Sequence, residues 1–198
     1  MSQEFVRLCD IKLADDIKGR VERHESFGAI ISITDNIRGL CPLSQISDAP
    51  TSNPEKYLKI GSTVAFRVLS IDYEKNRLIL THKKSLMVEK DHLILSYENV
   101  KSGDSAIGVI SSIQDHGCVI TFFNNVKAFA PLAELTHEFI DSASTMFKIG
   151  QTVKCRVLTV NPTEEKMRVT LKNSQIADSS IIKVGMVRIF KVSIMLIF

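Results

Sequence analysis

The sequence repeats itself once, at a constant spacing and without a gap. Gly19 matches Gly108 (108 − 19 = 89), and the same shift sets Gly28 on Gly117. It also carries the later segment 59–69 onto 148–158. An ungapped internal match of this length indicates a tandem array of one structural unit. The chain therefore contains two copies of a small domain, and each copy must bury its own core.

The limits of the match predict the domain organisation. We expect the first repeat at residues 10–84 and the second at 97–174, with a linker at 85–96. Residues 1–9 read as the end of a preceding segment, and 175–198 as a linker and the truncated start of a third repeat. Domains of about 75 to 80 residues are only marginally stable individually.

Hydrophobic patterning within the first repeat predicts five short strands. β-branched residues and turn residues place these strands at the segments beginning with Ile17, Ala29–Ile33, the segment closing on Gly39–Leu43, Thr63–Ile71 and Arg77–Lys83. A single helical turn is expected at Glu55–Leu58, between the third and fourth strands. The fold class is therefore all-β: two tandem five-stranded, partly open OB-fold barrels, each with a short helical insert between strands three and four.

Charge and cysteine usage exclude several function classes. The first repeat holds twelve Lys or Arg against ten Asp or Glu, and the second holds eight against eight, so neither is a strongly basic clamp. The four cysteines show no CxxC spacing and read as small buried hydrophobes rather than metal or redox groups. With no catalytic constellation and no phosphate-cradling loop either, we expect no enzyme, cofactor, metal site or small-molecule substrate.

The C-terminal segment 181–198 is mostly apolar, but three basic residues interrupt it: Lys183, Arg188 and Lys191. Charges of this kind are costly in hydrocarbon, so no membrane helix is expected. We expect a repeat that begins and then stops, with an aggregation-prone apolar tail and a chain that is a fragment or short form.

Several segments in fixed order carry a family resemblance. FGAII, RGLCPLSQIS, YLKIGSTVAFRVLSID and NRLILTHK resemble the S1 RNA-binding domain, as do HGCVITF, KAFAPLAEL, FKIGQTVKCRVLTV and KMRVTLK in the second copy. With the linker between them, the repeats are similar to a multi-repeat nucleolar family that processes pre-ribosomal RNA. The resemblance implies a role in ribosome biogenesis and small-subunit assembly, in the nucleus and nucleolus, with pre-ribosomal RNA and assembly proteins as partners.

The resemblance also implies contact residues in the first repeat. Phe27 and Arg77 match an aromatic and a basic contact position of the family, and Arg38 opens the third strand beside them. Ile30 and Pro42 depart from the pattern, which has an aromatic and a His at those places. The alternative for Phe27 is that it plugs the barrel.

The second repeat keeps less of that pattern. The candidates are His116 in place of the aromatic, Lys127 at the third strand, and Lys166 or Arg168 in the fifth. Phe122, Phe123 and Phe129 are candidates for further aromatic contact surface, but phenylalanines in strands are more often core residues. With the higher net charge and an aromatic, the first repeat is expected to bind RNA more tightly than the second.

Two function classes stay open at this point. The repeats form an RNA-binding module, or they are scaffold repeats that dock onto proteins in a pre-ribosomal complex. Other basic residues, including Lys83 and Lys84, read first as a solvated face. RNA binding should weaken steeply with salt, whereas an apolar protein interface should not.

Overall fold

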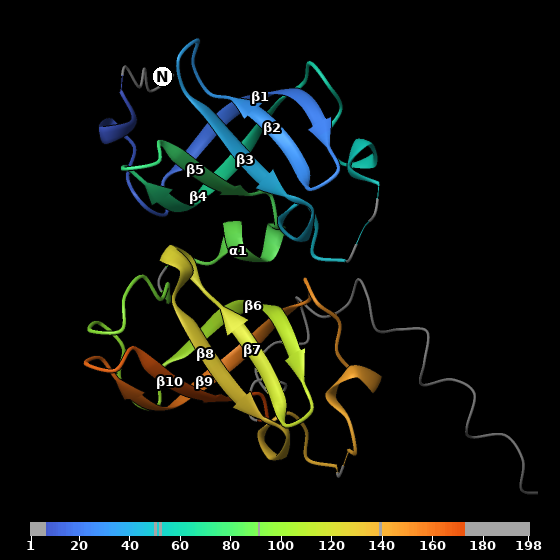
Figure 1. Ribbon diagram of the computed structural model, residues 1–198, viewed down its shortest axis with the longest axis vertical. Coiled ribbons are helices and arrows are strands. Elements are labelled where there is room, and N and C mark those ends of the chain that lie inside the picture. The colour runs from blue at the N-terminus through green and yellow to red at the C-terminus, as the bar shows by residue number, and fades with distance from the viewer. Residues whose placement is uncertain (1–6, 50, 52, 91, 139, 173–198) are drawn as a thin grey trace, which may run out of the picture.

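A computed structural model of the protein describes residues 7–49, 51, 53–90, 92–138 and 140–172. The described part folds into two closed five-stranded barrels stacked end to end (Figure 1). The tail prediction for residues 181–198 lies outside the described residues. The first barrel contains β1 (Asp16–Glu25), β2 (Gly28–Ser32), β3 (Arg38–Pro42), β4 (Thr63–Asp72) and β5 (Arg77–Thr81). The second contains β6 (Ser105–Gln114), β7 (Gly117–Thr121), β8 (Lys127–Pro131), β9 (Thr152–Asn161) and β10 (Lys166–Thr170).

Each barrel closes because its first strand pairs along both edges. The N-terminal half of β1 pairs antiparallel with β4, and its C-terminal half pairs with β2. A register shift between Val21 and Arg23 bends the strand between these two partners. β3 then pairs parallel with β5, and β5 returns antiparallel to β4. The second barrel repeats this topology, so the two barrels are closed, where the sequence had suggested a partly open form.

Short 3-10 turns form the helical insert between the third and fourth strands. In the first barrel these are η2 (Leu43–Gln45) and η3 (Pro54–Lys56); in the second they are η5 (Leu132–Glu134) and η6 (Ala143–Thr145). The side chain of Asn53 accepts a hydrogen bond from the Glu55 N–H and so caps η3. The helical insert predicted from the sequence is therefore present, as single turns.

The inward residues of the alternating strands form one apolar core per barrel. Ile31, Phe66 and Leu80 are fully buried in the first, and Ile110, Ile120 and Val169 in the second. Cys41, Cys118 and Cys155 are buried free thiols, whereas Cys9 is exposed. Burial raises the pKa of Cys41 and Cys155 to about 12, so both stay protonated at neutral pH.

A short helix joins the barrels: α1 (Lys84–Val88) lies between them in Figure 1. It begins at the last residue of the expected first repeat and continues into the expected linker. Arg67, buried in β4, orders it. Its guanidinium donates to the carbonyls of Leu86 (2.7 Å), Met87 (2.8 Å) and Glu89, and it pairs with both oxygens of Asp16. These bonds satisfy carbonyls that a helix end leaves without partners. The linker is therefore fixed to the first barrel.

Apolar and polar contacts then fix the second barrel against the first. Leu86 of α1 packs with Val109 and Phe123, which are both buried. The Lys83 ammonium donates to the Gly150 carbonyl at 2.7 Å and to the Ser47 carbonyl at 2.8 Å. We call this set the inter-barrel joint. Within the described residues, no helix is long and apolar enough to cross a membrane.

Candidate nucleic-acid interface

The candidate face of the first barrel is the outward surface of β2, β3 and β5. The ladder places Ile30 opposite Leu40, and Leu40 beside Ile79. All three side chains are half-buried, because they sit on the outer surface of the sheet and cover one another only in part. They form an apolar row across the strands. In OB-type barrels this surface of the second and third strands binds oligonucleotides.

An aromatic ring lies on one side of this row, toward the C-terminal end of β3. Phe27, in the turn between β1 and β2, is 56% exposed, so it does not plug the barrel. Its carbonyl accepts from the Leu43 N–H at 3.1 Å, which holds the turn against the end of β3. The approach is so close that a Cβ on Gly28 would lie 2.3 Å from the Cys41 carbonyl oxygen. Only glycine fits there, and it fixes the position of the exposed ring.

Two arginines lie on the opposite side of the row. Arg38 and Arg77 begin β3 and β5, which run parallel, so both precede the Leu40–Ile79 contact by two residues. Both are exposed. Arg38 pairs with Glu22 at 2.8 Å. A surface ion pair of this kind contributes only about 0–1 kcal/mol, so Arg38 can exchange it for a phosphate.

The second barrel places different chemistry on the same face. The ladder sets Val119 opposite Phe129, and Phe129 beside Arg168. The His116 ring lies 6.4 Å from the Phe129 ring, within the range of an aromatic pair. An imidazole, a phenyl ring and a guanidinium therefore meet on this surface. Among the sequence candidates, the structure brings His116 and Arg168 together through Phe129.

Phe129 lies on this face, although the sequence interpretation favoured a position in the core. Phe122 and Phe123 are indeed core residues, with exposures of 2% and 1%, but Phe129 is half-buried on the outer surface. The signal was in its neighbours: Ala128 and Ala130 are buried, so strict alternation along β8 turns Phe129 outward. Phe129 also occupies the position of Leu40 in the repeat.

The lysine candidates lie at the beginnings of their strands. Lys127 opens β8 and is exposed, and its backbone N–H and carbonyl both bond to the Tyr97 hydroxyl. Lys166 opens β10, is 76% exposed, and pairs with Glu164 at 2.9 Å. They match Arg38 and Arg77 by position. The seven predicted residues thus divide into two sets, one on each barrel.

The structure contradicts the prediction that Lys83 lies on a solvent-exposed face. Its side chain is fully buried in the inter-barrel joint. Burial lowers its pKa to about 8, and the nearby Asp48 carboxylate partly offsets this effect. The burial comes from the second barrel, which no local pattern around Lys83 could reveal. Lys84, its neighbour, is exposed as expected.

Both barrels therefore have the architecture of oligonucleotide-binding domains, with aromatic or basic groups on the surface that such domains use. Residues 10–83 and 99–172 each match the S1 RNA binding domain family, and the chain belongs to that family.

Within this family, several individual proteins are similar to most of the chain. The chain is 38% identical over 168 residues to the Protein RRP5 homolog of Mus musculus, covering 85% of this chain and 9% of that protein. It is 34% identical over 169 residues to the rRNA biogenesis protein rrp5 of Schizosaccharomyces pombe, covering 85% of this chain and 10% of that protein. A small ribosomal subunit protein bS1 homolog of Bacillus subtilis is 27% identical over 165 residues, covering 83% of this chain and 42% of that protein. The chain thus spans about a tenth of the length of its RRP5 relatives.

Proposed function

We propose that the two repeats bind single-stranded RNA through the outward faces of β2–β3–β5 and β7–β8–β10. The observation that carries the proposal is the exposed Phe27 ring, held beside an apolar row with two arginines on the other side of it. Bases stack on aromatic side chains, whereas cations follow the phosphates. The second barrel offers His116, Phe129 and Arg168 for the same purpose.

The biological setting is part of this proposal. The similarity to rRNA biogenesis proteins supports a role in ribosome biogenesis, with pre-ribosomal RNA processing and small-subunit assembly as its specific form. Pre-ribosomal RNA and assembly proteins would then be the partners, and the nucleolus the place of action. Imaging of the tagged protein against a nucleolar marker checks the location. A purely cytoplasmic signal would contradict it.

A salt titration tests RNA binding directly. Fluorescence anisotropy with a labelled single-stranded RNA should show affinity that falls with salt. If Arg38, Arg77, Lys127, Lys166 and Arg168 contact phosphates, the slope of log affinity against log salt should be about −3.5. Absence of binding at low salt would reject the proposal.

One feature favours a second candidate function, that of a protein scaffold. Ile30, Leu40 and Ile79 make the centre of the first face apolar, and such a row could pack against a partner protein. In that case, RNA affinity would be weak, and the binding of a pre-ribosomal protein would change little with salt. The same titration therefore separates the two functions.

A further inference from the structure

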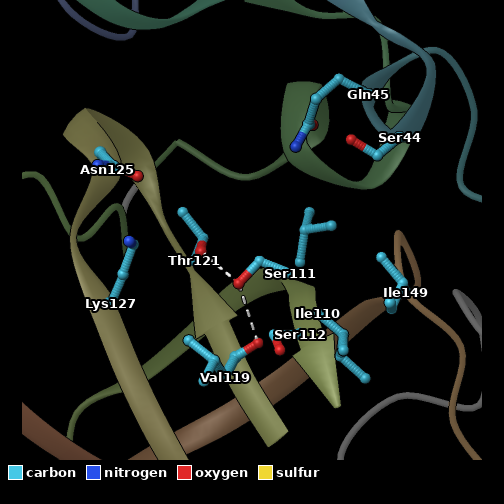
Figure 2. A pocket seen from close by; sticks show the side chains of 11 residues that line it. Ser44, Gln45, Ile110, Ser111, Ser112, Val119, Thr121, Asn125, Lys127 and Ile149 are labelled. Atoms are coloured by element: carbon cyan, nitrogen blue, oxygen red, sulfur yellow. Dashed lines mark hydrogen bonds between the residues drawn. The ribbon is translucent and has the colours of Figure 1, made fainter. Parts of the chain in front are cut away.

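A groove of about 560 Å³ lies between the two barrels. Figure 2 shows its two walls: Ser44 and Gln45 of η2 on one side, and Ser111, Val119, Thr121 and Lys127 of the second barrel on the other. Its volume is within the range of about 300–1,000 Å³ that small-molecule sites occupy. The groove is therefore large enough for one small polar molecule, or for one unit of a polymer passing through it.

The groove connects the two candidate faces. η2 begins directly after β3, at the end where Leu43 bonds to the Phe27 carbonyl. On the opposite wall, Val119 and Lys127 belong to the candidate face of the second barrel. Figure 1 shows β2 and β3 above β7 and β8 on the same side of the molecule. A strand lying on Phe27 would enter the groove next and leave it along β7 and β8.

Gln45 supplies an independent sign of a ligand. The residue is only 8% exposed, and its Oε1 atom is buried without a hydrogen-bond partner among the described residues. A buried amide oxygen left unpaired costs free energy, so a rotation of the amide that turns this oxygen toward a donor of a ligand in the groove would be stabilising. The exocyclic amino groups and ring N–H groups of nucleobases are donors of this kind.

The opposite wall has the remaining chemistry of a nucleotide site. Thr121 donates to the Ser111 hydroxyl at 2.8 Å, and Ser111 donates to the Val119 carbonyl at 3.2 Å. These hydroxyl oxygens can still accept from a base or from a ribose hydroxyl. Lys127 adds one cation at the edge for a phosphate, and the Val119 side chain adds an apolar surface.

The inter-barrel joint holds the two walls in place. Lys83 reaches the Gly150 carbonyl, next to Ile149 on the groove edge. Asp48, three residues after Gln45, accepts from Thr152 of the second barrel at 3.3 Å and bonds to Ser85. The groove is therefore formed before any ligand arrives, which lowers the entropy cost of binding.

We infer that this groove binds one nucleotide of a single RNA strand that crosses from the first barrel to the second. The inference rests on the proposed RNA-binding function and adds a site that belongs to neither repeat alone. Gln45 reads the base, Ser111 and Thr121 contact the base or the sugar, and Lys127 neutralises the adjoining phosphate. The two repeats then bind one continuous strand, with the groove as its central position.

Affinities for a short and a long RNA test this inference. An oligonucleotide of about 4 nucleotides occupies one barrel, whereas one of about 12 nucleotides spans both. Gln45→Leu and Thr121→Val should each weaken binding of the long RNA about fivefold, the usual effect of one lost hydrogen bond. Gln45→Leu, in η2 and outside both candidate faces, should leave the short RNA unaffected. The control is Thr63→Val, which makes the same chemical change as Thr121→Val at an exposed position of β4, a strand of neither candidate face, and should change neither affinity.

A crosslinking experiment on the unaltered chain tests the groove site even if a variant folds poorly. Irradiation of the unaltered chain with a long RNA carrying 4-thiouridine should crosslink within 44–45 or 119–127, mapped by mass spectrometry. Crosslinks confined to the Phe27 and His116 regions, or an unchanged long-RNA affinity in Gln45→Leu, would overturn the groove site alone. If the wild-type chain binds neither RNA, the proposed function is overturned as well.

Discussion

Phe27 is an aromatic side chain that the fold leaves in solvent, and its surroundings decide what its loss should do. Because the ring is 56% exposed, Phe27→Ala should leave the melting temperature nearly unchanged. Stacking of one base contributes about 1–3 kcal/mol, so RNA affinity should fall about tenfold or more. Anisotropy titrations combined with thermal melts measure both quantities. A large drop in melting temperature with unchanged affinity would instead make Phe27 a structural residue.

The matched substitution in the second barrel ranks the two repeats. His116→Ala removes a smaller ring that already lies against Phe129. We expect its effect on RNA affinity to be weaker than that of Phe27→Ala, because the first repeat carries the larger aromatic and the higher net charge. Titration of both variants with one RNA at one salt concentration tests the order. An equal or larger effect of His116→Ala would show that the second barrel contributes at least as much.

Arg67 shows how differently one residue type can act at matched positions of the repeat. It is 2% exposed and bonds to Asp16 and to three carbonyls around α1, whereas its counterpart Arg156 is exposed. Arg67→Ala would leave buried carbonyls unpaired, and we expect it to lower the free energy of unfolding by about 3 kcal/mol. Arg156→Ala should cost less than about 0.5 kcal/mol. Urea unfolding compares the two, and similar losses would contradict the assigned role of Arg67.

At the scale of the element, α1 is a short helix whose stability comes from what it touches. Five residues cannot form a stable helix alone, so α1 depends on Arg67 and on the apolar contacts of Leu86. Leu86→Ala should cost about 2–4 kcal/mol, because it leaves a cavity between the barrels. Val88, on the same helix, is 73% exposed, so Val88→Ala is the matched control.

The same variant reports on the cooperativity of the two barrels. With the inter-barrel joint intact, we expect one calorimetric transition for the described domains. Leu86→Ala should separate it into two, since the barrels would then unfold independently. Two transitions already present in the wild type would mean that the joint does not couple the barrels.

At the scale of the whole molecule, Lys83 makes the joint depend on pH. Its pKa is about 8 in the folded chain, against 10.5 for an ordinary lysine, so the unfolded chain binds more protons between these values. The contribution of Lys83 to the free energy of unfolding therefore rises with pH across this window and is lost as pH falls through about 8. Between pH 7 and pH 10, wild type should gain about 2 kcal/mol relative to Lys83→Met.

Urea unfolding of both chains at several pH values measures this difference directly. Subtracting the variant removes the titration of groups that do not interact with Lys83, such as Cys155, whose raised pKa acts in the opposite direction above pH 9. Lys84→Met, at the exposed neighbouring position, should show the wild-type pH dependence. A parallel pH profile for wild type and Lys83→Met would refute a depressed pKa in the joint.

Sequence patterns that are local and periodic predicted the strands and the two barrels. They did not predict the side chains that are buried by contacts with distant parts of the chain. Strand alternation and the spacing of 89 residues were enough for two five-stranded barrels. Phe27 and Arg77 were candidates because of the family resemblance, and the structure leaves both side chains exposed. Lys83 and Arg67 were missed because their burial depends on partners far along the chain, such as Gly150 and the carbonyls around Leu86. Phe129 was assigned to the core because phenylalanines in strands are usually buried, although the alternation along β8 turns this residue outward.

The apolar contacts of the joint involve residues that differ between the two copies. Ile107, Val109 and Phe123 of the second barrel pack in the joint, whereas the matching residues of the first are Lys18, Arg20 and Thr34. At these positions, therefore, only the second copy has the apolar surface against which the first barrel packs. The surfaces of the two barrels therefore determine their order along the chain. A chain with the two barrels exchanged would keep every strand but lose the contact between them.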